Sequence, residues 1–144
     1  MVRVTVDTHI LVSGLTFPEG NPRKLLELAR AGEIDLAFSD VILDQLADVL
    51  VRKFEWPNPD VPEVRRQFGL FARRVVPTQV IHAVADDPDD NAILECTVAA
   101  GSEYIVSGDR HLLQLGAFRS IRVLKVADFL EVLRQREGGQ SSQC

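Results

Sequence analysis

Three aspartates, Asp7, Asp90 and Asp109, stand where oxygen ligands for a metal ion could converge. Asp7 follows the alternating β-branched run of residues 2–6, and Asp109 ends the segment that begins with the apolar run 104–106. Three clustered carboxylates repel one another, and a hard divalent cation such as Mg²⁺ or Mn²⁺ removes that repulsion. Such an ion activates water and stabilises negative charge on phosphate oxygens. The pattern therefore indicates phosphodiester chemistry.

Each aspartate taken alone also fits a structural role. Asp90 is placed to cap a helix, an interaction worth about 1 kcal/mol, and Asp7 and Asp109 fit turn or capping acids. Asp90, however, begins a stripe at helical spacing, so its side chain should point along the face that the helix turns towards the sheet. The other members of that stripe are Ile93, Leu94, Thr97 and Val98. The joint placement of the three aspartates is what favours a shared site.

The elements that must position these residues alternate between strands and helices. Strands are predicted at residues 2–6, 34–38, 74–80, 104–106 and 121–124, and helices at 21–31, 39–53, 64–75, 91–100 and 128–136. Such alternation favours parallel strands joined by right-handed crossovers, and hence a three-layer α/β/α sandwich. Ligands of such sheets collect at the carboxyl ends of the strands, where the winding reverses. If the first and fourth strands are neighbours there, Asp7 and Asp109 share one crevice.

Composition limits the class of protein. The chain has 144 residues, 46% hydrophobic content and a formal charge of −5, which predicts one compact domain over residues 1–136 and a polar, disordered tail over 137–144. The negative net charge argues against a protein that binds nucleic acid through a generally cationic surface. Apolar runs are too short to span a bilayer, and the two cysteines form no disulfide framework. We therefore expect a cytoplasmic protein.

Three segments together resemble the PIN domain family, and more narrowly its VapC-like ribonuclease toxins. They are Val4–Gly14, Asp87–Asn91 and Ile105–Leu113, and the resemblance spans residues 2 to about 130. It implies a five-stranded parallel sheet and a Mg²⁺- or Mn²⁺-dependent endoribonuclease that acts on RNA and is neutralised by a small antitoxin protein. It also implies that Asp7, Asp90 and Asp109 hold the metal and that Thr8 and Ser107 lie beside it, where we expect both to contact the substrate. The resemblance leaves open whether the protein forms a homodimer.

Gln45 is a departure from that family, which usually has a glutamate at the matching position. The surrounding helix has an apolar stripe of Ile42, Leu43, Leu46, Val49 and Leu50. Gln45 lies about 100° from the centre of that stripe and Asp44 and Asp48 about 160° away, so neither aspartate replaces the glutamate easily. Gln45 can orient a water but brings no negative charge. A module that binds RNA or a protein without cutting therefore remains the alternative.

Residues near Asp109 give further predictions. Arg110 is a candidate for phosphate contact because it follows Asp109 directly. His111 stands where this branch often has another acid; it fits either a phosphate ligand or an ordinary histidine at a helix start. A phosphatase with Asp7 as nucleophile is a weaker alternative, since His9 stands where such enzymes of the haloacid-dehalogenase type have a second aspartate.

Overall fold

The computed structural model describes residues 1–143 apart from 57–59 and 85–87, and for residues 60, 61 and 137–143 it describes the backbone alone. A six-stranded sheet has the order β3-β2-β1-β4-β6-β5. Its strands are β1 Val2–Val6, β2 Ile34–Phe38, β3 Ala72–Arg74, β4 Tyr104–Val106, β5 Ala117–Phe118 and β6 Ile121–Leu124. The helices are α1 Thr8–Thr16, α2 Asn21–Arg30, α3 Asp40–Phe54, α4 Asp60–Phe71, α5 Pro88–Ala100, α6 Arg110–Leu115 and α7 Val126–Gln143.

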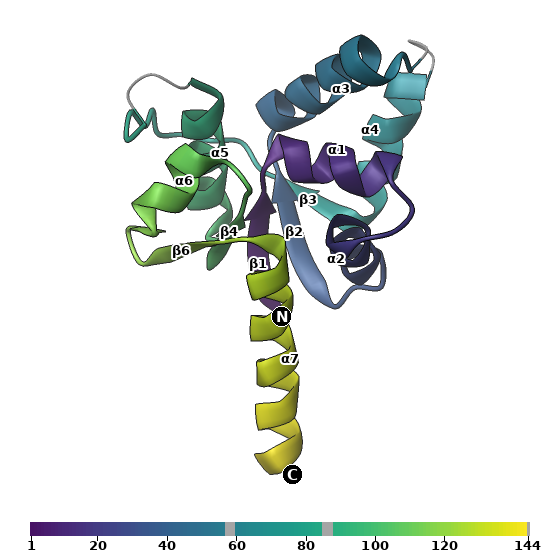
Figure 1. Cartoon of the computed structure of the whole chain (residues 1–144). Helices are drawn as coiled ribbons and strands as arrows, with labels where there is room; N and C mark the ends of the chain where they lie inside the picture. The colour runs from purple at the N-terminus through teal and green to yellow at the C-terminus, as the bar shows by residue number, and fades with distance from the viewer. Residues whose placement is uncertain (57–59, 85–87, 144) are drawn as a thin grey trace.

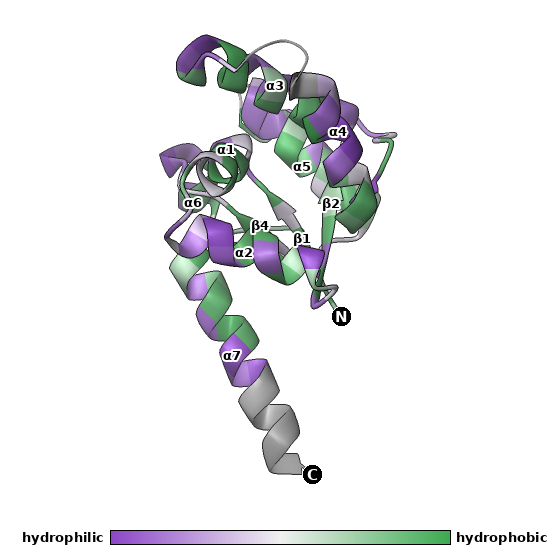
Figure 2. Cartoon of the chain, turned by 90° about the vertical axis from the view of Figure 1, so that its right-hand side faces the viewer, coloured by the Kyte–Doolittle hydropathy of each residue, from purple (hydrophilic) through white to green (hydrophobic). Residues whose placement is uncertain are grey.

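Helices cover the sheet as the sequence predicted. Figure 1 shows α5 and α6 together on one side of the strands and α1 to α4 on the other, so the layered α/β/α architecture is confirmed. Helix α2 and the first part of α7 alternate between hydrophilic and hydrophobic residues, as helices with one packed face do (Figure 2). The predicted stripe of α3 is buried throughout, at Ile42, Leu43, Leu46, Val49 and Leu50.

The sheet departs from five parallel strands by one short edge strand. Five strands are parallel, and β5 pairs antiparallel with β6. The hairpin turn consists of Arg119 and Ser120, whose φ angles are 48° and 71°. Positive φ at both central residues matches the twist of a tight hairpin. Arginine and serine are not typical of such turns, so the sequence carried little signal for this strand.

The strand predicted at residues 74–80 lies earlier in the chain than expected. Strand β3 instead covers Ala72–Arg74 and follows α4 without a loop. One further backbone bond, from Val75 N–H to Phe38 O at 2.8 Å, follows the strand. Pro77 has no N–H to donate, which explains why the β-branched residues after Val75 do not extend the pairing.

The C-terminal helix also differs from its predicted bounds. It was expected at residues 128–136, whereas α7 runs over Val126–Gln143. The side chains of residues 137–144 lie outside the described part of the chain, so an unpacked tail there stays a prediction. Among the described residues, no helix combines the length and the apolar character that crossing a membrane requires.

Candidate metal centre

Strands β1 and β4 bring the first and last aspartates of the predicted set to one edge of the sheet. The two strands are parallel neighbours, and Val6 is in register with Val106. The residues that follow, Asp7 and Ser107, therefore lie side by side, and Asp7 N–H donates to Val106 O at 2.9 Å. The sheet reverses its winding between these strands, so the predicted neighbourhood of the first and fourth strands is confirmed.

Ser107 links Asp7 to Asp109. Its Oγ donates to Asp7 Oδ2 at 2.7 Å and accepts from the backbone N–H of Asp109 at 2.9 Å. Ser107 is fully buried, and Asp7 is 5% exposed. A hydroxyl that donates to a buried carboxylate fixes the direction of that carboxylate. This placement fits a residue that orients the two acids, and the prediction that Ser107 contacts substrate stays untested.

Both terminal aspartates also cap helices. Asp7 Oδ1 accepts from His9 N–H at 3.2 Å at the start of α1, and Asp109 Oδ1 accepts from His111 N–H at 2.7 Å at the start of α6. The capping role, which the sequence analysis weighed against a role in a metal site, is therefore confirmed for Asp7 and Asp109, and their role as metal ligands stays a prediction. Capping holds each carboxylate in place at the end of its strand.

Asp90 reaches the same edge from α5. It is 4% exposed, and Ile93, Leu94 and Thr97 of the predicted stripe are buried with it, so the expected orientation is confirmed. The start of α5 is held by two polar side chains one turn apart. Asn91 Oδ1 accepts from Val84 N–H and its Nδ2 donates to Val84 O, while Glu95 Oε2 accepts from Ile81 N–H.

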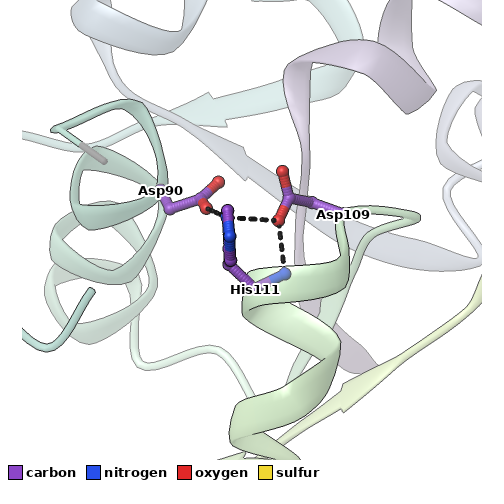
Figure 3. A group of neighbouring side chains, drawn as sticks. All are labelled: Asp90, Asp109 and His111. Atoms are coloured by element: carbon purple, nitrogen blue, oxygen red, sulfur yellow. Dashed lines mark hydrogen bonds and ion pairs between the residues drawn. The ribbon is translucent and has the colours of Figure 1, made fainter. Parts of the chain in front are cut away.

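Asp90, Asp109 and His111 form a closely spaced group (Figure 3). One ligand atom from each lies within 4.8 Å of the others. His111 Nδ1 is 3.6 Å from Asp109 Oδ1 and 4.0 Å from Asp90 Oδ2. The imidazole thus lies close to a carboxylate of α5 and to that of the residue capping α6, a placement that the sequence analysis did not predict, because it considered only a phosphate ligand or an ordinary helix-start histidine. The only signal for it was the position of His111 two residues after Asp109.

Gln45 lies in a polar chain that connects α1, α3 and α5. Its Oε1 accepts from Thr8 Oγ1 at 2.8 Å, and its Nε2 donates to Asp89 Oδ1 at 3.0 Å. Gln45 thereby joins the residue after Asp7 to the residue before Asp90. Asp89 was not among the candidate site residues of the sequence analysis.

The other aspartates of α3 face away from the site, as expected. Asp48 pairs with Arg52 at 2.6 Å, and Asp44 pairs with Arg65. At the start of the same helix, Arg74 donates hydrogen bonds to Asp40 and holds the pKa of that carboxyl below its usual range. These surface pairs leave Gln45 as the residue of α3 that is directed towards the acids.

The donor set fits a divalent cation. Two carboxylates and an imidazole provide oxygen and nitrogen donors. Asp7 is not in the group whose ligand atoms lie within 4.8 Å of one another; it lies next to that group because Ser107 bonds both its carboxylate and the backbone N–H of Asp109. The carboxylates of Asp90 and Asp109, held close together, repel each other unless a cation lies between them. Ligand roles for Asp7, Asp90 and Asp109 nevertheless remain predictions, as does phosphate contact by the exposed Arg110. Asp86 and Asp87 lie outside the described residues.

Cys96 is no part of this chemistry. It lies fully buried on α5, and burial raises the pKa of its thiol to about 12. The thiol therefore stays protonated at neutral pH and does not act as a nucleophile.

Comparisons with known proteins agree with the fold. The family model for the PIN domain matches residues 3–111. The structure is similar to a chain in the crystal structure of VapBC2 from Rickettsia felis bound to a DNA fragment from their promoter, with a TM-score of 0.58 and 13% sequence identity. That alignment covers 85% of this chain and 97% of the other. No curated protein sequence matches the chain significantly. Because the family model covers most of the chain and includes all three aspartates, the chain belongs to the PIN domain family.

Proposed function

We propose that the protein is a divalent-metal-dependent ribonuclease, using Mg²⁺ or Mn²⁺, and that it acts as the toxin of a toxin–antitoxin pair. The observation that carries this proposal is the convergence of acids from β1, β4 and α5 at one edge of the sheet. Asp90, Asp109 and His111 offer ligand atoms within 4.8 Å of one another, and Ser107 connects Asp7 to Asp109. Membership of the PIN domain family supports the nuclease assignment.

The chain's own residues divide the work in this proposal. Asp7, Asp90 and Asp109 hold the cation, and Ser107 fixes the direction of the first carboxylate. A bound divalent ion supplies Lewis acidity, an activated water and compensation for charge on the phosphate. Thr8 and Arg110 border the acids at the starts of α1 and α6, where an exposed guanidinium suits a phosphate oxygen of RNA.

The proposed partner is a small antitoxin protein, and the proposed compartment is the cytoplasm. Support for the partner comes from the structural similarity to a chain in a VapBC2 complex. If the proposal holds, a small protein encoded next to this one should suppress RNA cleavage when the two are mixed, and a protein that leaves cleavage unchanged would count against a toxin role.

A second candidate function is a PIN module that binds RNA or a protein without cutting. Gln45 favours it, because an amide held between Thr8 and Asp89 adds no charge to the site and cannot accept a proton from water. This alternative keeps the same fold and the same three aspartates.

RNA cleavage tests the proposal directly. Wild-type protein should cut RNA that contains single-stranded loops in the presence of Mn²⁺ and should not cut it in EDTA. Asp7→Asn and Asp109→Asn should each abolish cleavage, since an amide loses the charge that attracts the cation. Asp48→Asn is a matched control, because Asp48 is an exposed aspartate paired with Arg52. Cleavage that survives Asp7→Asn and Asp109→Asn would refute the nuclease assignment, and RNA binding without any cleavage would favour the alternative.

A further inference from the structure

His111 is the least expected member of the group in Figure 3. Its backbone is fixed, because its N–H donates to Asp109 Oδ1 at 2.7 Å and the next residue, Leu112, is fully buried. Its side chain is 53% exposed, so the imidazole borders the two carboxylates on the solvent side. A polar ring held by the fold beside two acids is placed to contact whatever they bind.

The distances suit coordination as well as an ion pair. Metal–ligand bonds of about 2.0–2.1 Å put neighbouring octahedral ligands about 3.0 Å apart and opposite ones about 4.2 Å apart. The separations of His111 Nδ1 from Asp109 Oδ1 and Asp90 Oδ2 are 3.6 Å and 4.0 Å, so a shift of about 0.6 Å would bring the first pair to the distance of neighbouring ligands and a shift of about 0.2 Å the second pair to that of opposite ones. Unlike an ammonium or guanidinium group, a neutral imidazole has a lone pair to donate.

We propose that His111 is a metal ligand and that it sets the cation preference of this protein towards Mn²⁺ over Mg²⁺. The inference rests on the proposed metal-dependent function. Mg²⁺ prefers an all-oxygen environment and keeps several waters. Mn²⁺ also binds oxygen ligands and is the weakest binder in the order Mn²⁺ < Fe²⁺ < Co²⁺, but as a transition-metal ion it accepts an imidazole nitrogen more readily than Mg²⁺ does. With His111 as a ligand, the site therefore offers a donor that favours Mn²⁺ over Mg²⁺.

His9 occupies a similar local position but not the same surroundings. It also lies two residues after a strand-end aspartate, and its Nδ1 is 3.6 Å from Asp7 Oδ1. Its side chain is 69% exposed, and Asp7 Oδ2 is engaged by Ser107. His111 lies near the carboxylates of Asp90 and Asp109, which come from different elements, whereas His9 lies near the carboxylate of Asp7. The structure thus favours His111 as the nitrogen ligand.

Pulsed electron paramagnetic resonance of bound Mn²⁺ tests this assignment without substrate. The chain has three histidines, so ¹⁴N coupling to Mn²⁺ is compared in wild type, His9→Ala, His82→Ala and His111→Ala. We expect the coupling in the first three and its loss in His111→Ala. Calorimetric titration then compares Mn²⁺ and Mg²⁺ affinities. His111→Asp should lower the ratio of Mn²⁺ to Mg²⁺ affinity by about tenfold.

The outcomes separate this inference from the proposed function. If Mn²⁺ binds and RNA is cut, but ¹⁴N coupling is missing or survives His111→Ala, His111 is only an ion-pair partner and the inference fails while the nuclease stands. If His111→Asp leaves the affinity ratio unchanged, the preference is not set by His111. If wild type binds neither ion and cuts no RNA, both proposals fail together.

Discussion

Gln45→Glu changes one hydrogen bond of the site into a repulsion. A glutamate keeps an acceptor for the Thr8 hydroxyl, but the atom that replaces Nε2 can no longer donate to Asp89 Oδ1, 3.0 Å away. Two unit charges at that distance repel by about 1.4 kcal/mol in water and by about 5.5 kcal/mol at an effective dielectric constant of 20. Because Asp89 is exposed, we expect a loss near the lower limit, about 2 kcal/mol.

Thermal unfolding measures this loss and its reversal by metal. For a chain of this size, about 2 kcal/mol lowers Tm by about 6 °C in EDTA. Saturating Mn²⁺ should raise the Tm of Gln45→Glu more than that of wild type, because the added carboxylate strengthens cation binding. Gln67→Glu is the matched control: Gln67 Nε2 donates to Glu63 Oε1 at 2.9 Å on the exposed face of α4. That variant should lose stability in EDTA without extra recovery in Mn²⁺.

Two results would refute the reasoning on Gln45. Equal responses of Gln45→Glu and Gln67→Glu to Mn²⁺ would show that a carboxylate at residue 45 does not strengthen cation binding. Unchanged stability of Gln45→Glu in EDTA would show that Asp89 and residue 45 do not interact. The same variant separates the two candidate functions, since a gain in RNA cleavage indicates a weakened enzyme and no gain indicates a non-cutting module.

Three further predictions concern the hydrogen bonds of Ser107, those of Asn91 and the thiol of Cys96. Ser107→Ala should lower the free energy of unfolding by about 2–3 kcal/mol and Ser102→Ala by about 1 kcal/mol, because Ser107 donates to a buried carboxylate and Ser102 bonds a neutral hydroxyl; equal losses in urea unfolding would contradict this. Asn91→Ala should speed amide exchange in the segment before α5 and weaken Mn²⁺ binding about tenfold, with Asn91→Asp intermediate because it keeps the acceptor; unchanged exchange would exclude a positioning role. The Cys96 thiol loses its proton near pH 9.0 in the unfolded chain and near pH 12 in the folded one. The free energy of unfolding of the wild type should therefore fall between these pH values, by up to about 1.4 kcal/mol per pH unit more than that of Cys96→Ala. Parallel pH profiles of the two proteins would contradict the raised pKa.

The local sequence was enough to predict elements that have both a regular spacing of apolar residues and clear start or stop residues. The apolar stripe of α3 placed Gln45 towards the acids and Asp44 and Asp48 away from them, because one buried helix face determines the direction of the rest. The β-branched run of β1 likewise placed Asp7 at the end of its strand. Strand β3 was misplaced because its pairing depends on how α4 delivers the chain to β2, which no local pattern encodes.

The position of His111 between two acids depends on tertiary structure. Its place at the start of α6 follows from the capping residue Asp109, but its distance from Asp90 is set by how α5 and α6 come together. The same holds for Asp89, whose contact with Gln45 joins helices that are 44 residues apart at that point. Sequence spacing identifies the residue types at a site more readily than the contacts between elements that are distant along the chain.

Crystals soaked in Mn²⁺ test the central claim most directly, which is that acids from β1, β4 and α5 share one divalent cation. Anomalous difference maps should show a peak in contact with the carboxylates of Asp7, Asp90 and Asp109, and the peak should vanish in Asp109→Asn crystals. The account would be contradicted if Mn²⁺ fully occupied other sites in the crystal and gave no peak here. It would also be contradicted by a peak that is not in contact with these carboxylates.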